Sequence, residues 1–123
     1  MSKYTNLVTA LKALTQGEAP TDEVETLPMA EDEWDRRPDT VVSYGTVRLD
    51  FEADALRGDC MKCDRAWEGS VDLFSLARNG AGWIPLIEKT LTNHCDGAWE
   101  LNSHTWERDT SLFHWEWTFE VED

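Results

Sequence analysis

The chain has 123 residues, of which 41% are hydrophobic and seven are Trp, so it can form one domain with a buried core. Its formal net charge of −14 argues against a static nucleic-acid binder and against binding to an anionic membrane surface, because phosphate contacts need Lys and Arg. No apolar run approaches the roughly 20 residues that span a bilayer, and three cysteines do not make a disulfide framework, so we expect a reducing cytoplasm.

An amphipathic helix is predicted over residues 2–14, because apolar side chains recur there at the spacing of one helical face. These side chains are Tyr4, Leu7, Val8, Leu11 and Leu14. Gly17 and Pro20 follow the last of them and indicate where the helix has ended. We expect the apolar face to lie on the core of the domain.

Residues 15–39 are predicted to form an acidic loop, because Asp and Glu dominate this segment and three Pro residues interrupt it. A loop of this length without regular structure is uncommon in a compact domain and is usually functional or mobile. Trp34 lies inside its most acidic run. We expect Trp34 either to fold back onto the domain or to contact a partner, and we count it as a candidate partner contact.

Two strands and a second helix follow. Residues 40–49 and 65–74 are predicted to be strands, because apolar residues alternate there with polar ones. Residues 83–94 are predicted to be a helix, in which Ile84, Ile87 and Leu91 share a face and Pro85 stands in the first turn, where its missing N–H is not needed.

The strongest pattern lies in residues 111–121, where a large apolar side chain occupies every second position. These side chains are Phe113, Trp115, Trp117, Phe119 and Val121. Such a strand has one aromatic face, and that face must be covered because each large apolar side chain contributes roughly 1.5–3 kcal/mol on burial. Residues 98–106 are predicted to pair with it through a hairpin loop at 108–110, which places Leu101 opposite Trp117 and Trp99 opposite Phe119.

The elements follow one another in the order helix, strand, strand, helix, strand, strand. This order predicts an α+β fold: an antiparallel four-stranded sheet with two helices packed on one face, the aromatic one. We expect a single domain over residues 1–123, with the acidic loop at about 15–39.

The cysteines allow one metal hypothesis. Cys60, Cys63, His94 and Cys95 are residue types that bind zinc, and Cys-x-x-Cys is a common half-site. His94 and Cys95 are adjacent, however, and adjacent side chains seldom point at one metal ion. We therefore expect free thiols, no metal and no cofactor.

The predicted hairpin register places His104 opposite His114, and Asn102 opposite Glu116, on the polar face of the sheet. Two histidines and a carboxylate could bind a divalent metal or exchange protons, but we expect an exposed polar face of the paired strands instead. No nucleophile motif or phosphate-binding glycine loop is present, so we expect no catalytic residues.

The same register places Trp106 opposite Leu112 near the hairpin tip. An exposed apolar pair can mark a protein contact. Trp106 and Leu112 are therefore candidate partner contacts, although packing within the domain is the alternative.

Several motifs in the second half resemble, in their order and spacing, the tail terminator (tail completion, head–tail joining) proteins of long-tailed bacteriophages. These motifs are Val71-Asp72-Leu73-Phe74, Ile87-Glu88-Lys89-Thr90-Leu91, Trp99, Trp106-Glu107-Arg108-Asp109-Thr110, His114-Trp115 and Phe119-Glu120. The segment 41–45 is similar to the family's first strand, so the resemblance covers about residues 40–123. The acidic segment 15–39 and the pair Cys60 and Cys63 depart from the family pattern.

The resemblance implies a virion protein of the tail neck region that is assembled in the host cytoplasm and has no enzymatic activity. Such proteins form a ring, usually a hexamer, at the head-proximal end of the tail tube. The ring stops tube growth and contacts the tail tube protein and the head–tail connector. DNA passes through its bore without specific binding, and a charge of −14 per subunit fits a bore that repels DNA.

Two other hypotheses remain open. A small acidic protein could mimic DNA and block a nucleic-acid enzyme, with an affinity that falls as salt rises. A zinc module or metal-dependent enzyme could use the four Cys and His residues named above, and it would lose its fold with a chelator.

Overall fold

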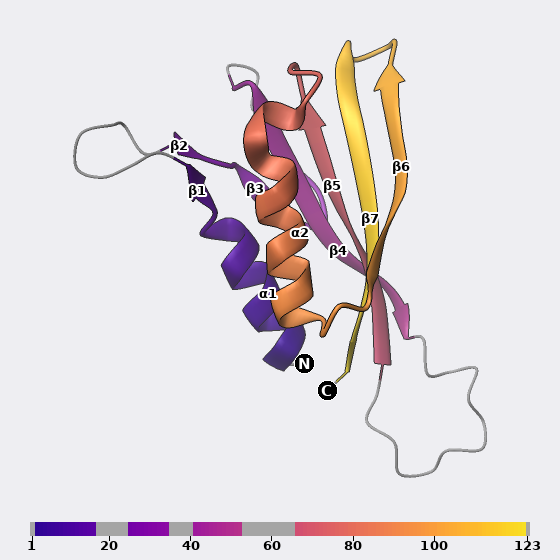
Figure 1. Ribbon diagram of the computed structural model, residues 1–123. Helices are drawn as coiled ribbons and strands as arrows, with labels where there is room; N and C mark the ends of the chain where they lie inside the picture. The colour runs from indigo at the N-terminus through magenta and orange to yellow at the C-terminus, as the bar shows by residue number, and fades with distance from the viewer. Residues whose placement is uncertain (1, 17–24, 35–40, 53–65, 123) are drawn as a thin grey trace.

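The structure is a computed structural model that describes residues 2–16, 25–34, 41–52 and 66–122. Two helices, α1 (Ser2–Lys12) and α2 (Trp83–His94), lie on one face of a five-stranded sheet, and a short 3-10 turn, η2 (Gly80–Gly82), leads into α2 (Figure 1). In spatial order the sheet consists of β3 (Met29–Glu31), β4 (Ser43–Glu52), β5 (Ala66–Ser75), β7 (Leu112–Glu122) and β6 (Trp99–Glu107). A separate two-stranded sheet is formed by β1 (Thr15–Gln16) and β2 (Glu25–Thr26).

The predicted four-stranded antiparallel sheet is wrong, because the sheet is mixed and has a fifth strand. This strand, β3, lies inside the segment predicted to be an acidic loop and runs parallel to β4, with Met29 opposite Gly45. Met29 is only 8% exposed and Leu27 is also buried, so both side chains reach the core. Met29 packs over Gly45, and a Cβ atom added to Gly45 would lie only 2.8 Å from the terminal methyl carbon of Met29. Two apolar residues around a proline are too short a pattern to predict a strand.

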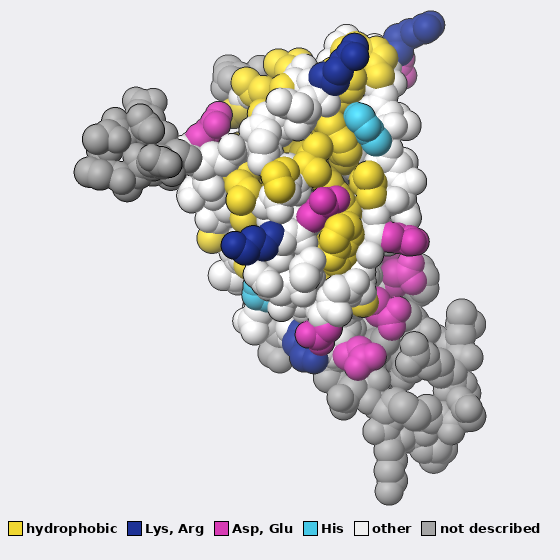
Figure 2. Space-filling model, viewed as in Figure 1, with side chains coloured by type: hydrophobic (Ala, Val, Ile, Leu, Met, Phe, Trp, Pro, Cys, Tyr) yellow, Lys and Arg dark blue, Asp and Glu magenta, His cyan; other side chains and the backbone are white. Residues whose placement is uncertain are grey.

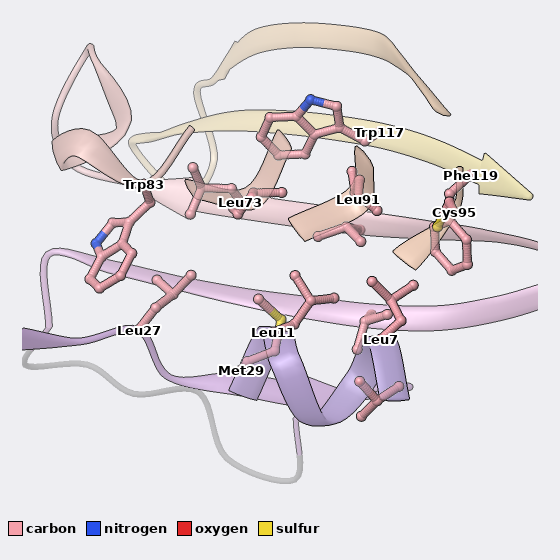
Figure 3. Close-up of a cluster of buried hydrophobic side chains, with 14 of the residues drawn as sticks. Leu7, Leu11, Leu27, Met29, Leu73, Trp83, Leu91, Cys95, Trp117 and Phe119 are labelled. Carbon is pink, nitrogen blue, oxygen red and sulfur yellow. The ribbon is translucent and has the colours of Figure 1, made fainter. Parts of the chain in front are cut away.

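The aromatic face of β7 is buried beneath the helices, as the alternation predicts. Trp115, Trp117, Phe119 and Val121 are all buried. They meet the predicted apolar faces of both helices in one core, to which α1 contributes Leu7 and Leu11, and in which Leu91 of α2 lies near Trp117 (Figure 3). The predicted positions of both helices and of the four long strands are therefore confirmed to within a few residues.

The register of the hairpin between β6 and β7 is as predicted up to Leu101 and differs from there to the turn. Trp99 lies opposite Phe119 and Leu101 opposite Trp117, which confirms the first part. A β-bulge between Leu101 and Ser103 then shifts the pairing by one residue, so that Glu107 pairs with Leu112 and the turn has four residues instead of three. A shift of one residue moves every later side chain to the other face.

Because of the bulge, three predicted cross-strand pairs are wrong. His104 lies opposite Trp115 and stacks on it at 4.6 Å on the helix side of the sheet, so it is not opposite His114. Trp106 lies opposite Phe113 on that same side, whereas Leu112 lies on the other face. Ser103, instead of Asn102, is opposite Glu116.

Candidate interaction surfaces

The face of the sheet that carries no helix, which we call the open face, has a buried acidic residue at its centre. Asp72 of β5 alternates with the core residues Val71 and Leu73, so its side chain points away from the helices. This side chain is nevertheless only 4% exposed. A carboxylate buried to this degree needs hydrogen-bond and charge partners, and side chains of the neighbouring strands supply them.

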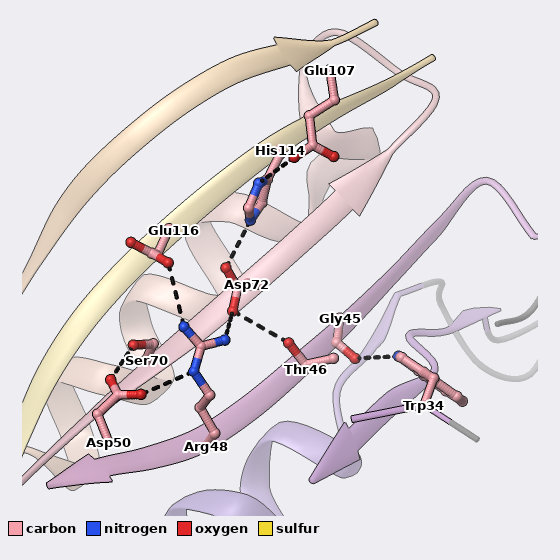
Figure 4. A network of polar contacts seen from close by, with 10 residues as sticks. All are labelled: Trp34, Gly45, Thr46, Arg48, Asp50, Ser70, Asp72, Glu107, His114 and Glu116. Atoms are coloured by element: carbon pink, nitrogen blue, oxygen red, sulfur yellow. Dashed lines mark hydrogen bonds and ion pairs between the residues drawn. The ribbon is translucent and has the colours of Figure 1, made fainter. Parts of the chain in front are cut away.

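Both carboxylate oxygens of Asp72 are engaged (Figure 4). Its Oδ2 accepts hydrogen bonds from Arg48 Nη1 at 3.0 Å and from Thr46 Oγ1 at 3.3 Å. Its Oδ1 lies 2.7 Å from Nε2 of His114. Asp72 therefore joins strands β4, β5 and β7 through side chains that are distant in the sequence.

Arg48 extends the network to two further carboxylates, on β4 and β7. Its Nε donates to Asp50 Oδ1 at 2.9 Å, and its Nη2 lies 3.6 Å from Glu116 Oε2. Its side chain is 40% exposed, so solvent screens these outer pairs more than the pair with Asp72. Arg48 therefore offsets charge on three carboxylates at once.

His114 is held between two acidic side chains. Its Nε2 faces Asp72, and its Nδ1 lies 3.1 Å from Glu107 Oε2. Burial of the ring would lower the pKa of His114, but the hydrogen bond to Asp72 and the charges of Asp72 and Glu107 outweigh burial and raise it above the ordinary value of 6.5. The ring can donate from both nitrogens only when it is protonated, so this arrangement favours the charged form.

A row of aromatic rings crosses the open face beside the network. His114 stacks on Phe74 at 4.2 Å, and Phe74 stacks on Tyr44 at 5.0 Å. Trp34 closes the row with its ring edge-on to Tyr44 at 6.1 Å, and its Nε1 donates to the carbonyl oxygen of Gly45 at 3.0 Å. The sequence left two alternatives for Trp34, and in the structure it folds back onto the domain.

The ring row and the acidic network enclose a pocket of about 370 Å³. It is lined by the aromatic residues of the row, by Thr46 and Arg48, and by four carboxylates, those of Asp32, Glu33, Asp72 and Glu116. Asp32 and Glu33 are exposed at its rim, directly after β3. We call this feature the open-face pocket.

Apolar side chains adjoin the pocket where β4, β5 and β7 approach the hairpin end. Val42 and Leu76 are joined by a backbone hydrogen bond of 2.9 Å and are both exposed, Leu76 by 59%. The pairing of Ser75 with Phe113 brings Leu112 next to Leu76. We call Val42, Leu76 and Leu112, together with Phe74, the open-face patch.

A second uncovered apolar surface lies on the helix side, along the edge strand β6. Figure 1 shows β6 at the edge of the sheet beyond α2. Trp106 is 53% exposed there and packs against Phe113 at 4.7 Å, and Leu101 is also exposed. We call Leu101, His104, Trp106 and Phe113 the hairpin strip. Figure 2 shows hydrophobic side chains gathered in a band on this side of the molecule, with Lys or Arg side chains at its upper end.

The three predicted contact residues thus occupy different places. Trp34 is part of the open-face pocket, Leu112 belongs to the open-face patch, and Trp106 belongs to the hairpin strip. Sequence reasoning missed Arg48 and Asp72, the centre of the network. The only sequence signal for Asp72 was its place on the polar side of a predicted strand, and nothing in the sequence linked it to Arg48.

The predicted zinc ligands are only partly described. Cys60 and Cys63 lie outside the described residues, whereas His94 and Cys95 end α2. Burial and the nearby charge of Asp96 raise the pKa of the Cys95 thiol to about 12, which disfavours the thiolate that zinc requires. In the described segments, no three His, Cys, Asp or Glu side chains are grouped to hold a metal ion.

Within the same described segments, neither helix is long and apolar enough to cross a bilayer. Comparison of the sequence with protein-family models and with curated proteins gives no match. We therefore infer function from the resemblance noted above, from the fold, and from the surfaces that the fold leaves uncovered.

Proposed function

We propose that the chain is a structural protein of the tail terminator class: it assembles head to tail into a ring at the head-proximal end of a phage tail, ends tail growth and joins the tail to the head. The observation that carries this proposal is that two different apolar surfaces, the hairpin strip and the open-face patch, are uncovered on opposite faces of one sheet. Contiguous exposed apolar side chains mark interaction sites more often than chance exposure does.

The difference between the two surfaces supports a ring in particular. A two-fold dimer buries the same patch on both subunits, whereas head-to-tail contacts join two different patches and form a ring when the rotation between neighbours closes. The hairpin strip offers Trp106 and Phe113, which are among the residue types that anchor interfaces. The open-face patch offers Leu76 and Val42 beside the aromatic row. Each subunit therefore has one surface of each kind for its two neighbours.

Charge and resemblance support the place of this ring in a phage tail. The motifs that resemble tail terminators lie mostly on α2, β5, β6 and β7. Of these elements, β6 and β7 carry the hairpin strip, and β5 and β7 carry Phe74 and Leu112 of the open-face patch. The net charge of −14 supports a ring through whose bore DNA passes without binding. The proposal includes a hexamer, contacts with the tail tube protein and the head–tail connector, and no enzymatic activity.

Native mass spectrometry over a concentration series tests the assembly. We expect a closed oligomer of six subunits, alone or on addition of the tail tube protein of the same phage. The same mixture should also give shorter tail tubes than tube protein alone. A chain that stays monomeric with tube protein present and leaves tube length unchanged would contradict the proposal.

The charge of −14 also favours a second candidate, an acidic inhibitor that mimics DNA. Asp72 does not suit that role, because it is buried and paired with Arg48 and His114 instead of facing a partner. An inhibitor would bind a basic protein as a monomer or dimer, and its affinity would fall as salt rises. The tail terminator would form rings whether or not a basic protein is present.

A further inference from the structure

The open-face pocket combines two kinds of lining. The half-buried ring of Trp34 supplies aromatic surface, and Asp32, Glu33 and Glu116 supply carboxylates. The other two rings are already packed, since Tyr44 is buried and Phe74 is stacked between Tyr44 and His114. An arginine guanidinium is planar, stacks on aromatic rings and pairs with carboxylates through a fork of N–H donors. The pocket therefore has the chemistry of a seat for an arginine side chain.

Two carboxylates of the lining are not paired with Arg48 and could bind such a cation. Arg48 already pairs with Asp50 on its own strand, with Asp72 on β5 and with Glu116 on β7. Asp32 and Glu33 at the rim form no ion pair with any other described residue and face solvent. Among the described residues that line the pocket, the carboxylates without an ion pair thus lie at the rim, next to Trp34.

A matching cation is present at the other uncovered surface of the same chain. Arg108 is exposed in the turn between β6 and β7, directly after the pair of Glu107 with Leu112 and two residues after the strip residue Trp106. Asp109 is its acidic neighbour in the turn, and Glu107 is engaged with His114 and Thr110. Arg78 also lies at this end, but its guanidinium carbon is 5.9 Å from the centre of the Phe113 ring, so it already makes a cation–π contact within the chain. At the hairpin tip an arginine lies beside apolar side chains, and on the open face carboxylates lie beside apolar side chains. The two surfaces are therefore complementary in charge.

We propose that the open-face pocket of one copy binds the Arg108 guanidinium of the next copy, with the hairpin strip against the open-face patch. This inference rests on the head-to-tail assembly proposed above and adds to it the pair of sites that fixes the register between neighbours. Charge complementarity explains how subunits of net charge −14 can associate: each contact places one of the few cations of the chain on a carboxylate-rich pocket.

A charge swap tests the pairing, with assembly measured by native mass spectrometry and sedimentation of the full chain. Arg108→Glu and Glu33→Arg should each weaken self-association by about tenfold or more, because each places like charges together. The double variant Arg108→Glu with Glu33→Arg should restore association to within about threefold of the parent chain. Lys12→Glu serves as the matched control, since it reverses the charge of a cation on the exposed side of α1, away from the proposed contact.

The outcomes separate this inference from the proposed function. If the parent chain assembles, and Arg108→Glu changes nothing or the double variant fails to recover, the pairing is wrong and the ring remains. If Lys12→Glu weakens assembly as much as Arg108→Glu does, the effect is one of overall charge and the pairing is also wrong. A Glu33→Arg variant that assembles normally but no longer joins tail tubes would assign the pocket to the tube protein instead. A parent chain that never associates would overturn both proposals together.

Discussion

Asp72 and His114 lie 42 residues apart in the sequence and 2.7 Å apart on the open face of the sheet. Their side chains come from adjacent strands, β5 and β7, and together with Arg48 they place a compact ionic network beneath an exposed surface. This network makes the open face a rigid, preorganised surface, because each of its charged groups is held by at least one partner.

Loss of the Asp72 charge should destabilise the domain. Asp72→Asn keeps the shape of the side chain but removes the most buried anionic partner of Arg48 and His114. Because Asp72 is buried and Arg48 can turn toward solvent, we expect the free energy of unfolding to fall by about 1–3 kcal/mol. Urea denaturation measures this change. The exposed carboxylate Glu100 on β6 provides the control, since Glu100→Gln should change it by less than about 0.5 kcal/mol.

The stability supplied by His114 should depend on pH. Its pKa is raised in the folded state, so its stabilising contribution is fully present below the ordinary value of 6.5 and is lost as the pH rises through the raised folded pKa. The parent chain should therefore exceed His114→Gln in stability by more at pH 6 than at pH 9. Thermal unfolding of both chains at each pH measures this difference. A difference that grows toward pH 9 would contradict the assignment.

Trp117→Ala should be severe. Trp117 is 0% exposed beneath α2, and its Nε1 donates to Glu88 Oε2 at 2.9 Å. Removal of a buried Trp side chain costs about 3–5 kcal/mol through lost burial and a residual cavity. The melting temperature checks this, and Trp106→Ala supplies the same substitution at an exposed site. Equal losses in the two variants would show that the core assignment is wrong.

Trp106→Ala should instead weaken assembly. Trp106 is 53% exposed on the hairpin strip, so its truncation leaves the fold intact but removes a large aromatic anchor from the proposed subunit contact. We expect at least a tenfold rise in the dissociation constant of the oligomer, which corresponds to about 1.4 kcal/mol. Lys12→Ala, on the exposed side of α1, should leave assembly unchanged in the same sedimentation experiment.

A chelator should leave the fold intact. The buried thiol of Cys95 has a raised pKa, and free thiols are expected at Cys60 and Cys63. We therefore expect the melting temperature to be the same with and without EDTA, and Cys60→Ser to fold like the parent chain. Unfolding by EDTA that added zinc reverses would instead support the zinc module.

The local elements could be predicted from the sequence because their periodicities are long and strong. The aromatic alternation in β7 and the helical spacing of Leu7, Leu11 and their neighbours each extend over most of an element. Burial then follows directly, since only one face of each element is apolar. The start of the hairpin register could be predicted for the same reason, because Leu101 and Trp99 must meet Trp117 and Phe119.

Three features were decided only by tertiary structure. The strand β3 forms because Leu27 and Met29 find a place on the core beside Gly45, which no local pattern reveals. The bulge at Asn102 moves Trp106 and His104 to the helix side, because pairing with β7 overrides simple alternation along β6.

The ionic network of Arg48, Asp72 and His114 is the third feature. In the sequence, Asp72 is one acidic residue among 25 and has no distinguishing neighbour. Only the packing of β4, β5 and β7 side by side brings its partners within hydrogen-bond distance. A sequence therefore specifies which face of each strand is buried through periodicity, whereas contacts across strands depend on sheet order and register, which are set by the whole core at once.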